Sequence, residues 1–212
     1  RGAIATCRMV AANPGSRHNP ILISGRSGTG KWHLTQATIR EAAARHGLDY
    51  ELHAPDSLAN EIILAIRDDR LSALRDRYIG IGLFGVSHIQ YFLRRERSLG
   101  ILLEIISARV SAGLQVILSI HSDDLVGATF REAFRGVLRV VKIARLRPPD
   151  ISARRNIVAR MVRMNDAAMP KECVNFLARS YSKNVRELEG AVMRVICCSK
   201  FQDEPITMDL IR

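Results

Sequence analysis

A glycine-rich turn that ends in a lysine constrains this chain more than any other feature of its sequence. The turn runs from Gly25 to Lys31, contains Gly28 and Gly30, and follows the apolar run Ile21-Leu22-Ile23. A helical pattern begins directly after it. Glycines allow the backbone to curl so that successive N–H groups face one point, and the positive end of the next helix lies beside that point. The combination predicts a phosphate-binding loop.

Short buried runs alternate with helical patterns on both sides of this loop. The expected strands are 21–23, 83–86, 116–120 and 140–143, and the expected helices are 33–46, two within 57–77, and 98–112. Strands that alternate with helices of this length predict a mainly parallel sheet covered by helices.

The pattern changes at Pro148-Pro149, because proline stops the preceding element and stiffens the turn. Only helical patterns follow, at 150–165, 171–180 and 185–199. Asn184, with Glu187 three residues later, is a capping-box signal for the last helix. We therefore expect an α/β core over residues 1–149 and a small helical lid over residues 150–212.

Charge indicates the class of partner. The chain of 212 residues carries 32 Lys and Arg against 21 Asp and Glu, a net charge of +11, and only five of the cations are Lys. Such a surface favours polyanionic partners, although an arginine-rich solvated surface without a ligand is the alternative.

No apolar run approaches the roughly 20 residues of a membrane helix. Four cysteines without ligand spacing favour a reducing, cytoplasmic location. Because the chain begins at Arg1 without a methionine, we treat it as part of a longer protein.

The residue after Lys31 departs from the usual phosphate-loop pattern. Such loops normally carry Ser or Thr there, whose hydroxyl ligates Mg²⁺, whereas this chain has Trp32. An indole offers no oxygen to a hard cation. We therefore expect nucleotide to bind through the backbone and Lys31, we expect no metal ligands, and we regard a role for Mg²⁺ as doubtful.

Several motifs together resemble the AAA+ module of the bacterial replication initiator family DnaA, and the resemblance covers nearly the whole chain. They are Asn19-Pro20, Gly28-Thr29-Gly30-Lys31 with His33-Leu34, Ile89-Gln90, Pro148-Pro149, and Asn184-Val185-Arg186-Glu187-Leu188-Glu189-Gly190. The resemblance implies a P-loop NTPase fold, binding of ATP or ADP, self-assembly and contact with origin DNA. The implied nucleotide-binding residues are Gly25, Ser27, Gly28, Thr29, Gly30, Lys31, Trp32, His33 and, from the lid, Arg186. The alternative for Arg186 is a surface arginine paired with Glu187 or Glu189.

Two departures from the family affect hydrolysis. The family places two acidic residues before the Ile-Gln pair, where this chain has Ser87 and His88, so no catalytic residue is assigned. Two interpretations of this pair stay open: His88 acts as a base, or Ser87 and His88 are only polar residues tolerated at the end of a strand. The family's inter-subunit arginine falls on Gly136-Val137-Leu138. Arg135 and Arg139 lie within two residues of it and are the candidate substitutes, with Arg135 assigned, unless Arg131, Arg135 and Arg139 form a solvated helical stripe. Hydrolysis is therefore expected to be weak or lost, and whether the chain is an enzyme stays open.

The family's contacts with single-stranded origin DNA match Ile63, Arg95 and Arg97, and guanidinium groups suit phosphate oxygens. Ordinary core packing is the alternative for Ile63. Two main functions remain: an initiator-type module that binds ATP or ADP and assembles on DNA, or a degenerate paralogue that regulates an active initiator by protein contact without nucleotide. A helicase-loader relative is a third.

Overall fold

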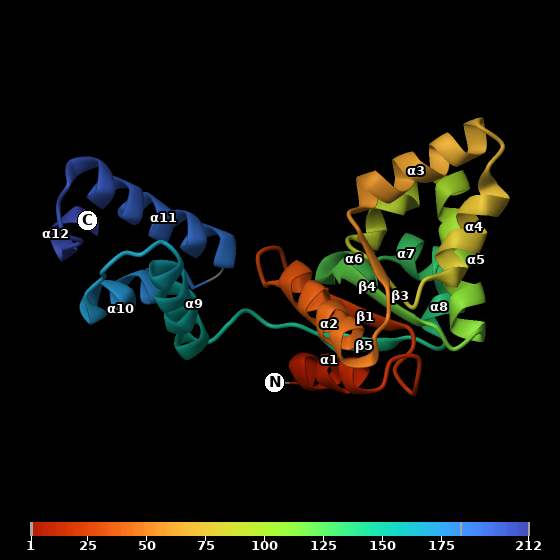
Figure 1. Ribbon diagram of the computed structural model, residues 1–212, viewed down its shortest axis with the longest axis horizontal. Coiled ribbons are helices and arrows are strands. Elements are labelled where there is room, and N and C mark those ends of the chain that lie inside the picture. Colours follow the sequence, from red (N-terminus) through yellow and green to blue (C-terminus); the bar gives the residue numbers. More distant parts are fainter. Residues whose placement is uncertain (1, 183, 212) are drawn as a thin grey trace. The chain divides into compact units, whose positions relative to one another are not determined.

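The structure is a computed structural model that describes residues 2–182 and 184–211 (Figure 1). Its contacts divide the chain into two compact units, which are described separately. The first comprises Arg1–Arg26 and Lys31–Leu146, and the second comprises Ser27–Gly30 and Arg147–Arg212. No helix within the described residues is long and apolar enough to cross a membrane.

The first unit is built on a sheet of five parallel strands in the order β2-β3-β4-β1-β5. The strands are β1 (Ile21–Gly25), β2 (Tyr50–His53), β3 (Leu83–Val86), β4 (Gln115–His121) and β5 (Lys142–Arg145). The parallel α/β core expected from the sequence is confirmed. Asn19 joins the start of β1 to β4, because its Nδ2 donates to the Leu114 carbonyl and its Oδ1 accepts from the Val116 N–H, both at 2.9 Å.

The two edge strands differ from the sequence-based expectation. Strand β2 is absent from that expectation, since its residues are exposed or only half-buried and form no apolar run. Strand β5, expected at 140–143, begins at Lys142, which pairs with Ile21. Val140 is 60% exposed and precedes the strand. The apolar pair Val140-Val141 gives a strand signal two residues too early.

Helices cover both faces of the sheet (Figure 1). The helices of this unit are α1 (Gly2–Ala12), α2 (Lys31–His46), α3 (Pro55–Arg67), α4 (Leu71–Gly80), the 3₁₀ helix η1 (Ile89–Arg94), α5 (Glu96–Ser111), α6 (Ser122–Val126), α7 (Ala128–Ala133) and α8 (Arg135–Leu138). Alternate residues of a strand face opposite sides, so Ile21 and Ile23 pack with α1 and α2, whereas Leu22 packs in the cluster of α3, α4 and α5.

A fully buried arginine joins the second of these layers to the sheet. Arg109 of α5 is 0% exposed, and its guanidinium donates to the backbone carbonyls of Tyr78, Ile81, Gly82 and Gln115. The bond to Ile81 is 2.8 Å long. Burial lowers the pKa of Arg109 to about 10. The side chain therefore closes the loop between α4 and β3 against the beginning of β4.

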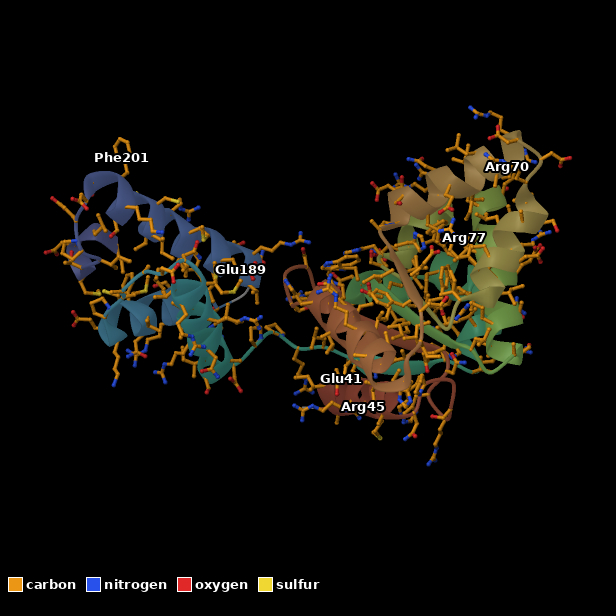
Figure 2. The ribbon with its side chains drawn as sticks, viewed as in Figure 1. Glu41, Arg45, Arg70, Arg77, Glu189 and Phe201 are labelled. Atoms are coloured by element: carbon orange, nitrogen blue, oxygen red, sulfur yellow. The ribbon has the colours of Figure 1, made fainter. Side chains whose placement is uncertain are left out.

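A polar network attaches the α3–α4 pair to strand β2. Arg77, labelled in Figure 2, donates to Glu51 of β2 through Nε at 2.9 Å and also to Glu61 of α3. The Tyr78 hydroxyl donates to Glu61 Oε2 at 2.5 Å and is itself buried. Burial, followed by the Glu61 hydrogen bond, raises the pKa of Tyr78 above its ordinary value.

This raised pKa predicts a loss of stability at alkaline pH. Above about pH 10 the unfolded chain ionises Tyr78 while the folded chain keeps it neutral, so stability is present below that pH and is lost as pH rises. Between about pH 9 and pH 11 the advantage of the wild type over Tyr78→Phe in free energy of unfolding should shrink by about 1.4 kcal/mol. Urea titrations at each pH measure this difference. A difference that does not change with pH would contradict the prediction.

The second unit is helical after Leu146. Its helices are α9 (Ile151–Met164), α10 (Lys171–Ser180), α11 (Val185–Gln202) and α12 (Met208–Ile211). Val158, Cys173 and Leu188 form the centre of its core, one from each of the three longer helices. The predicted start of α11 is confirmed. Asn184 Oδ1 accepts from the Arg186 N–H at 3.0 Å, while its Nδ2 donates to Glu187 at 3.2 Å.

Candidate functional site

The glycine-rich turn follows the carboxyl end of β1, the strand that lies between β4 and β5. Gly25 ends the strand in register with His121 of β4. Gly28 and Gly30 have φ angles of +69° and +89°, a region that glycine adopts without the steric cost paid by other residues. Helix α2 begins at Lys31, two residues earlier than predicted, which places its N-terminal N–H groups directly at the end of the turn.

Lys31 is folded back onto this turn. Its side chain is largely buried, with 5% of the residue exposed, and Nζ donates to the carbonyls of Gly25 at 2.7 Å and Arg26 at 2.9 Å. A positive charge is therefore held against the backbone at the carboxyl end of β1. Thr35 lies one helical turn later and its hydroxyl donates to the Lys31 carbonyl at 3.0 Å. This hydroxyl is buried within α2 rather than presented at the loop.

The other predicted loop residues differ in exposure. Thr29 is buried, Trp32 is half-buried and His33 is exposed in the first turn of α2. Ser27 is exposed. Trp32, which follows Lys31, thus places an indole in the first turn of α2.

Ser87 and His88 follow β3 at the same edge of the sheet. The Ser87 hydroxyl donates to the His53 carbonyl at 3.2 Å, and the His88 N–H donates to Ser119 Oγ of β4 at 3.2 Å. His88 has a left-handed backbone with φ +49° at the start of η1. Both hydroxyl groups are buried, and the two positions that carry acids in the family supply no carboxylate.

Sequence reasoning missed His53, which supports this edge. Its carbonyl accepts from both the N–H and the hydroxyl of Ser87. Its ring pairs with Glu51 at 2.8 Å and lies edge-on to Tyr78. The polar alternation of Tyr50-Glu51-Leu52-His53 was the available signal, but four residues on an edge strand are too few for a reliable pattern.

The residues expected to contact DNA lie on α3 and near η1. Ile63 is 48% exposed, so core packing, the alternative interpretation, is wrong for this residue within the first unit. Arg95 is half-buried, with its guanidinium 4.0 Å from the centre of the Tyr91 ring. Arg97 is exposed at the start of α5. The ring contact restricts the Arg95 side chain, while Arg97 remains accessible.

Two other arginines are candidates for contacts outside the DNA-binding residues: Arg186 for nucleotide and Arg135 for a neighbouring subunit. Arg135 begins α8 and is exposed, as are Arg131 and Arg139. Phe134 separates α7 from α8, so these three arginines do not lie on one continuous helix. Arg186 is exposed in the first turn of α11, and the ion pairs found among the described residues do not include it.

The chemistry of the loop suits phosphate better than a divalent cation. Backbone N–H groups at a helix start and an ammonium group bind anions. Hard cations need oxygen ligands, preferably carboxylates. Within the described ranges, 2–182 and 184–211, no group of three or more His, Cys, Asp or Glu could hold a metal ion.

A glycine loop at the end of β1, on a parallel sheet of order β2-β3-β4-β1-β5 and accompanied by a helical unit, defines the AAA+ class of P-loop proteins. More particularly, residues 1–133 match the model of the bacterial DnaA ATPase domain. The chain therefore belongs to that family.

Individual relatives agree with this assignment. The chromosomal replication initiator protein DnaA of Thermus thermophilus is 31% identical over 206 residues, which cover 97% of this chain and 47% of that protein. The chain thus spans about half the length of the curated relatives it matches.

Solved structures share the fold. Domain III of DnaA from Thermotoga maritima has a TM-score of 0.88 at 20% identity, covering 99% of this chain and 88% of that one. A replication initiator DnaA bound to AMPPCP and single-stranded DNA has a TM-score of 0.76 at 24% identity, covering 90% and 59%.

Proposed function

We propose that this chain is the nucleotide-binding module of a DnaA-type replication initiator. It binds ATP or ADP, assembles with neighbouring copies and contacts single-stranded origin DNA. Because an initiator acts on the chromosome, the proposal places it in the cytoplasm. The observation that carries the proposal is the Gly25–Lys31 loop, which holds the Lys31 ammonium at the start of α2. The relative bound to AMPPCP supports it.

The residues of the loop have different roles in binding. Gly28 and Gly30 give the backbone the curvature that lets N–H groups surround phosphate oxygens. Lys31 neutralises the added negative charge, and it contributes most where burial excludes water. Thr29, Trp32 and His33 flank the phosphates, and Arg186 is proposed as the contact from the lid. Arg135 is the proposed inter-subunit arginine.

Hydrolysis is weak or lost in this proposal. Phosphoryl transfer depends on a metal and on a group that positions the attacking water. Trp32 cannot ligate Mg²⁺, the Thr35 hydroxyl is turned to the Lys31 carbonyl, and Ser87 is bonded to His53. These residues do not fit a Mg²⁺ site, and no step of the proposed function uses the ion.

The loss of both acids at Ser87 and His88 favours one alternative, a paralogue that regulates an active initiator by protein contact. That alternative needs no nucleotide, so ATP binding discriminates between the two. The intact glycine turn and the buried position of Lys31 support the nucleotide-binding proposal instead.

Ile63 of α3 and two arginines at the η1–α5 junction form the proposed DNA contact. Ile63 presents an apolar surface, and Arg95 and Arg97 present guanidinium groups that pair with phosphate oxygens. The relative solved with single-stranded DNA supports DNA binding by a module of this fold.

Replacing both arginines should weaken DNA binding. For oligothymidylate in the presence of ATP, Arg95→Ala with Arg97→Ala should raise Kd about tenfold. The double variant should also reduce the slope of log K against log salt by about 1.4, since each lost phosphate contact accounts for about 0.7. Fluorescence anisotropy over a salt series measures both.

The matched control is Arg40→Ala, an exposed arginine on α2, which covers the opposite face of the sheet. Its affinity and salt slope should equal those of the wild type. Equal losses in the control and the double variant would show that only the general charge of the chain matters.

A further inference from the structure

We infer that the groove between α9 and α10 is a docking site for an acidic peptide segment of a partner protein that also carries an apolar side chain. The groove has a volume of about 410 Å³ and lies wholly within the helical part of the second unit. Arg155 and Arg163 line it from α9, Lys171 lines it from α10, and none of its lining residues is acidic.

Arg155, one of the residues that line this groove, has a buried nitrogen without a hydrogen-bond partner. Arg155 Nε is buried and makes no hydrogen bond in the structure. A buried donor without an acceptor costs free energy, and the cost is larger when the group is charged. An anionic ligand in the groove would offset this cost by pairing with the Arg155 guanidinium, which belongs to a residue that lines it.

The floor of the groove selects among anionic ligands. Val162, Met169 and Val174 line it with apolar surface between the cations. An acidic peptide with a leucine-like side chain places that side chain on the apolar floor. Its carboxylates pair at the same time with the cations that line the groove. Nucleic acid supplies the charge, but its bases bind by stacking on aromatic rings, and no aromatic residue lines the groove.

The groove is held open before any ligand arrives. Arg154 of α9 donates through Nε to the Ala178 carbonyl of α10 at 2.6 Å and through a terminal nitrogen to the Pro149 carbonyl at 2.7 Å. The bond to Ala178 ties α9 to α10, and the bond to Pro149 holds the Arg154 side chain at the start of α9, so binding needs little rearrangement.

The test uses the 212-residue chain and a fluorescein-labelled helical peptide of Glu, Ala and Leu in which a leucine stripe lies beside glutamates. Anisotropy should show saturable binding that Arg155→Gln weakens about tenfold. Arg160→Gln, a change at an exposed arginine of α9 outside the groove, should leave Kd within about twofold of the wild type. Replacing the peptide leucines by alanine should also weaken binding about tenfold.

Three outcomes would overturn the inference. They are absence of peptide binding, equal effects of Arg155→Gln and Arg160→Gln, and binding that does not depend on the leucines. Loss of oligothymidylate binding on Arg155→Gln without any effect on the peptide would assign the groove to DNA instead. If Arg155→Gln unfolds the chain, Arg163→Gln with Lys171→Gln replaces it, because both side chains are exposed.

Discussion

Lys31→Ala should abolish ATP binding at micromolar protein concentration, which corresponds to a loss of about a hundredfold in affinity. The substitution removes a charge-assisted contact with phosphate, of about 1.5–3 kcal/mol, where about 1.4 kcal/mol is a factor of ten. It also removes the two hydrogen bonds that hold the Gly25 and Arg26 carbonyls at the loop. Isothermal titration calorimetry with ATP and with ADP measures the loss.

The control for this experiment is Lys142→Ala, an exposed lysine at the start of β5. It makes the same change in net charge away from the loop, so its ATP affinity should match the wild type. If both variants keep wild-type affinity, Lys31 does not bind phosphate.

Arg109→Ala should cost about 3–5 kcal/mol in free energy of unfolding, the largest loss expected from a single substitution in the first unit. The guanidinium donates to four backbone carbonyls that join α4, the following loop and β4. Alanine removes these four hydrogen bonds and opens a cavity beside Phe84, whose ring centre lies 5.6 Å from Arg109 Cζ. Guanidinium chloride unfolding with linear extrapolation measures the change.

A surface arginine provides the comparison. Arg45, labelled with Glu41 in Figure 2, pairs with that residue one turn earlier on α2. Both side chains are 50% exposed. Arg45→Ala should change stability by no more than about 0.5 kcal/mol, as for other exposed pairs. A loss of similarly small size for Arg109→Ala would mean that the buried carbonyls find other donors.

The sequence predicted the parts of the fold whose signals are local. The glycine turn, the buried runs of β1 and β4 and the capped start of α11 each depend on neighbouring residues, and the structure has all three. The edge strands gave weaker signals because they are partly exposed. Strand β2 has no apolar run, and Val140 shifted the prediction for β5 by two residues.

The site was less accessible to sequence reasoning, because its support comes from distant residues. His53 contributes its carbonyl to Ser87, and a carbonyl leaves no trace in the amino-acid sequence. Arg109 resembles one more surface cation until the fold buries it. Ile63 directly follows the buried Ile62, and the two side chains point to different sides of helix α3. The sequence alone does not show which of them faces the core.

The most direct test of the Gly25–Lys31 loop is a calorimetric titration of the 212-residue chain with ATP, performed once with Mg²⁺ and once with EDTA. If the loop binds phosphates through its backbone and Lys31, ATP should bind in both solutions with affinities that agree within about threefold. Binding that requires Mg²⁺ would show that the chain retains metal ligands. Absence of binding in both solutions would contradict nucleotide binding altogether and leave the protein-contact alternative.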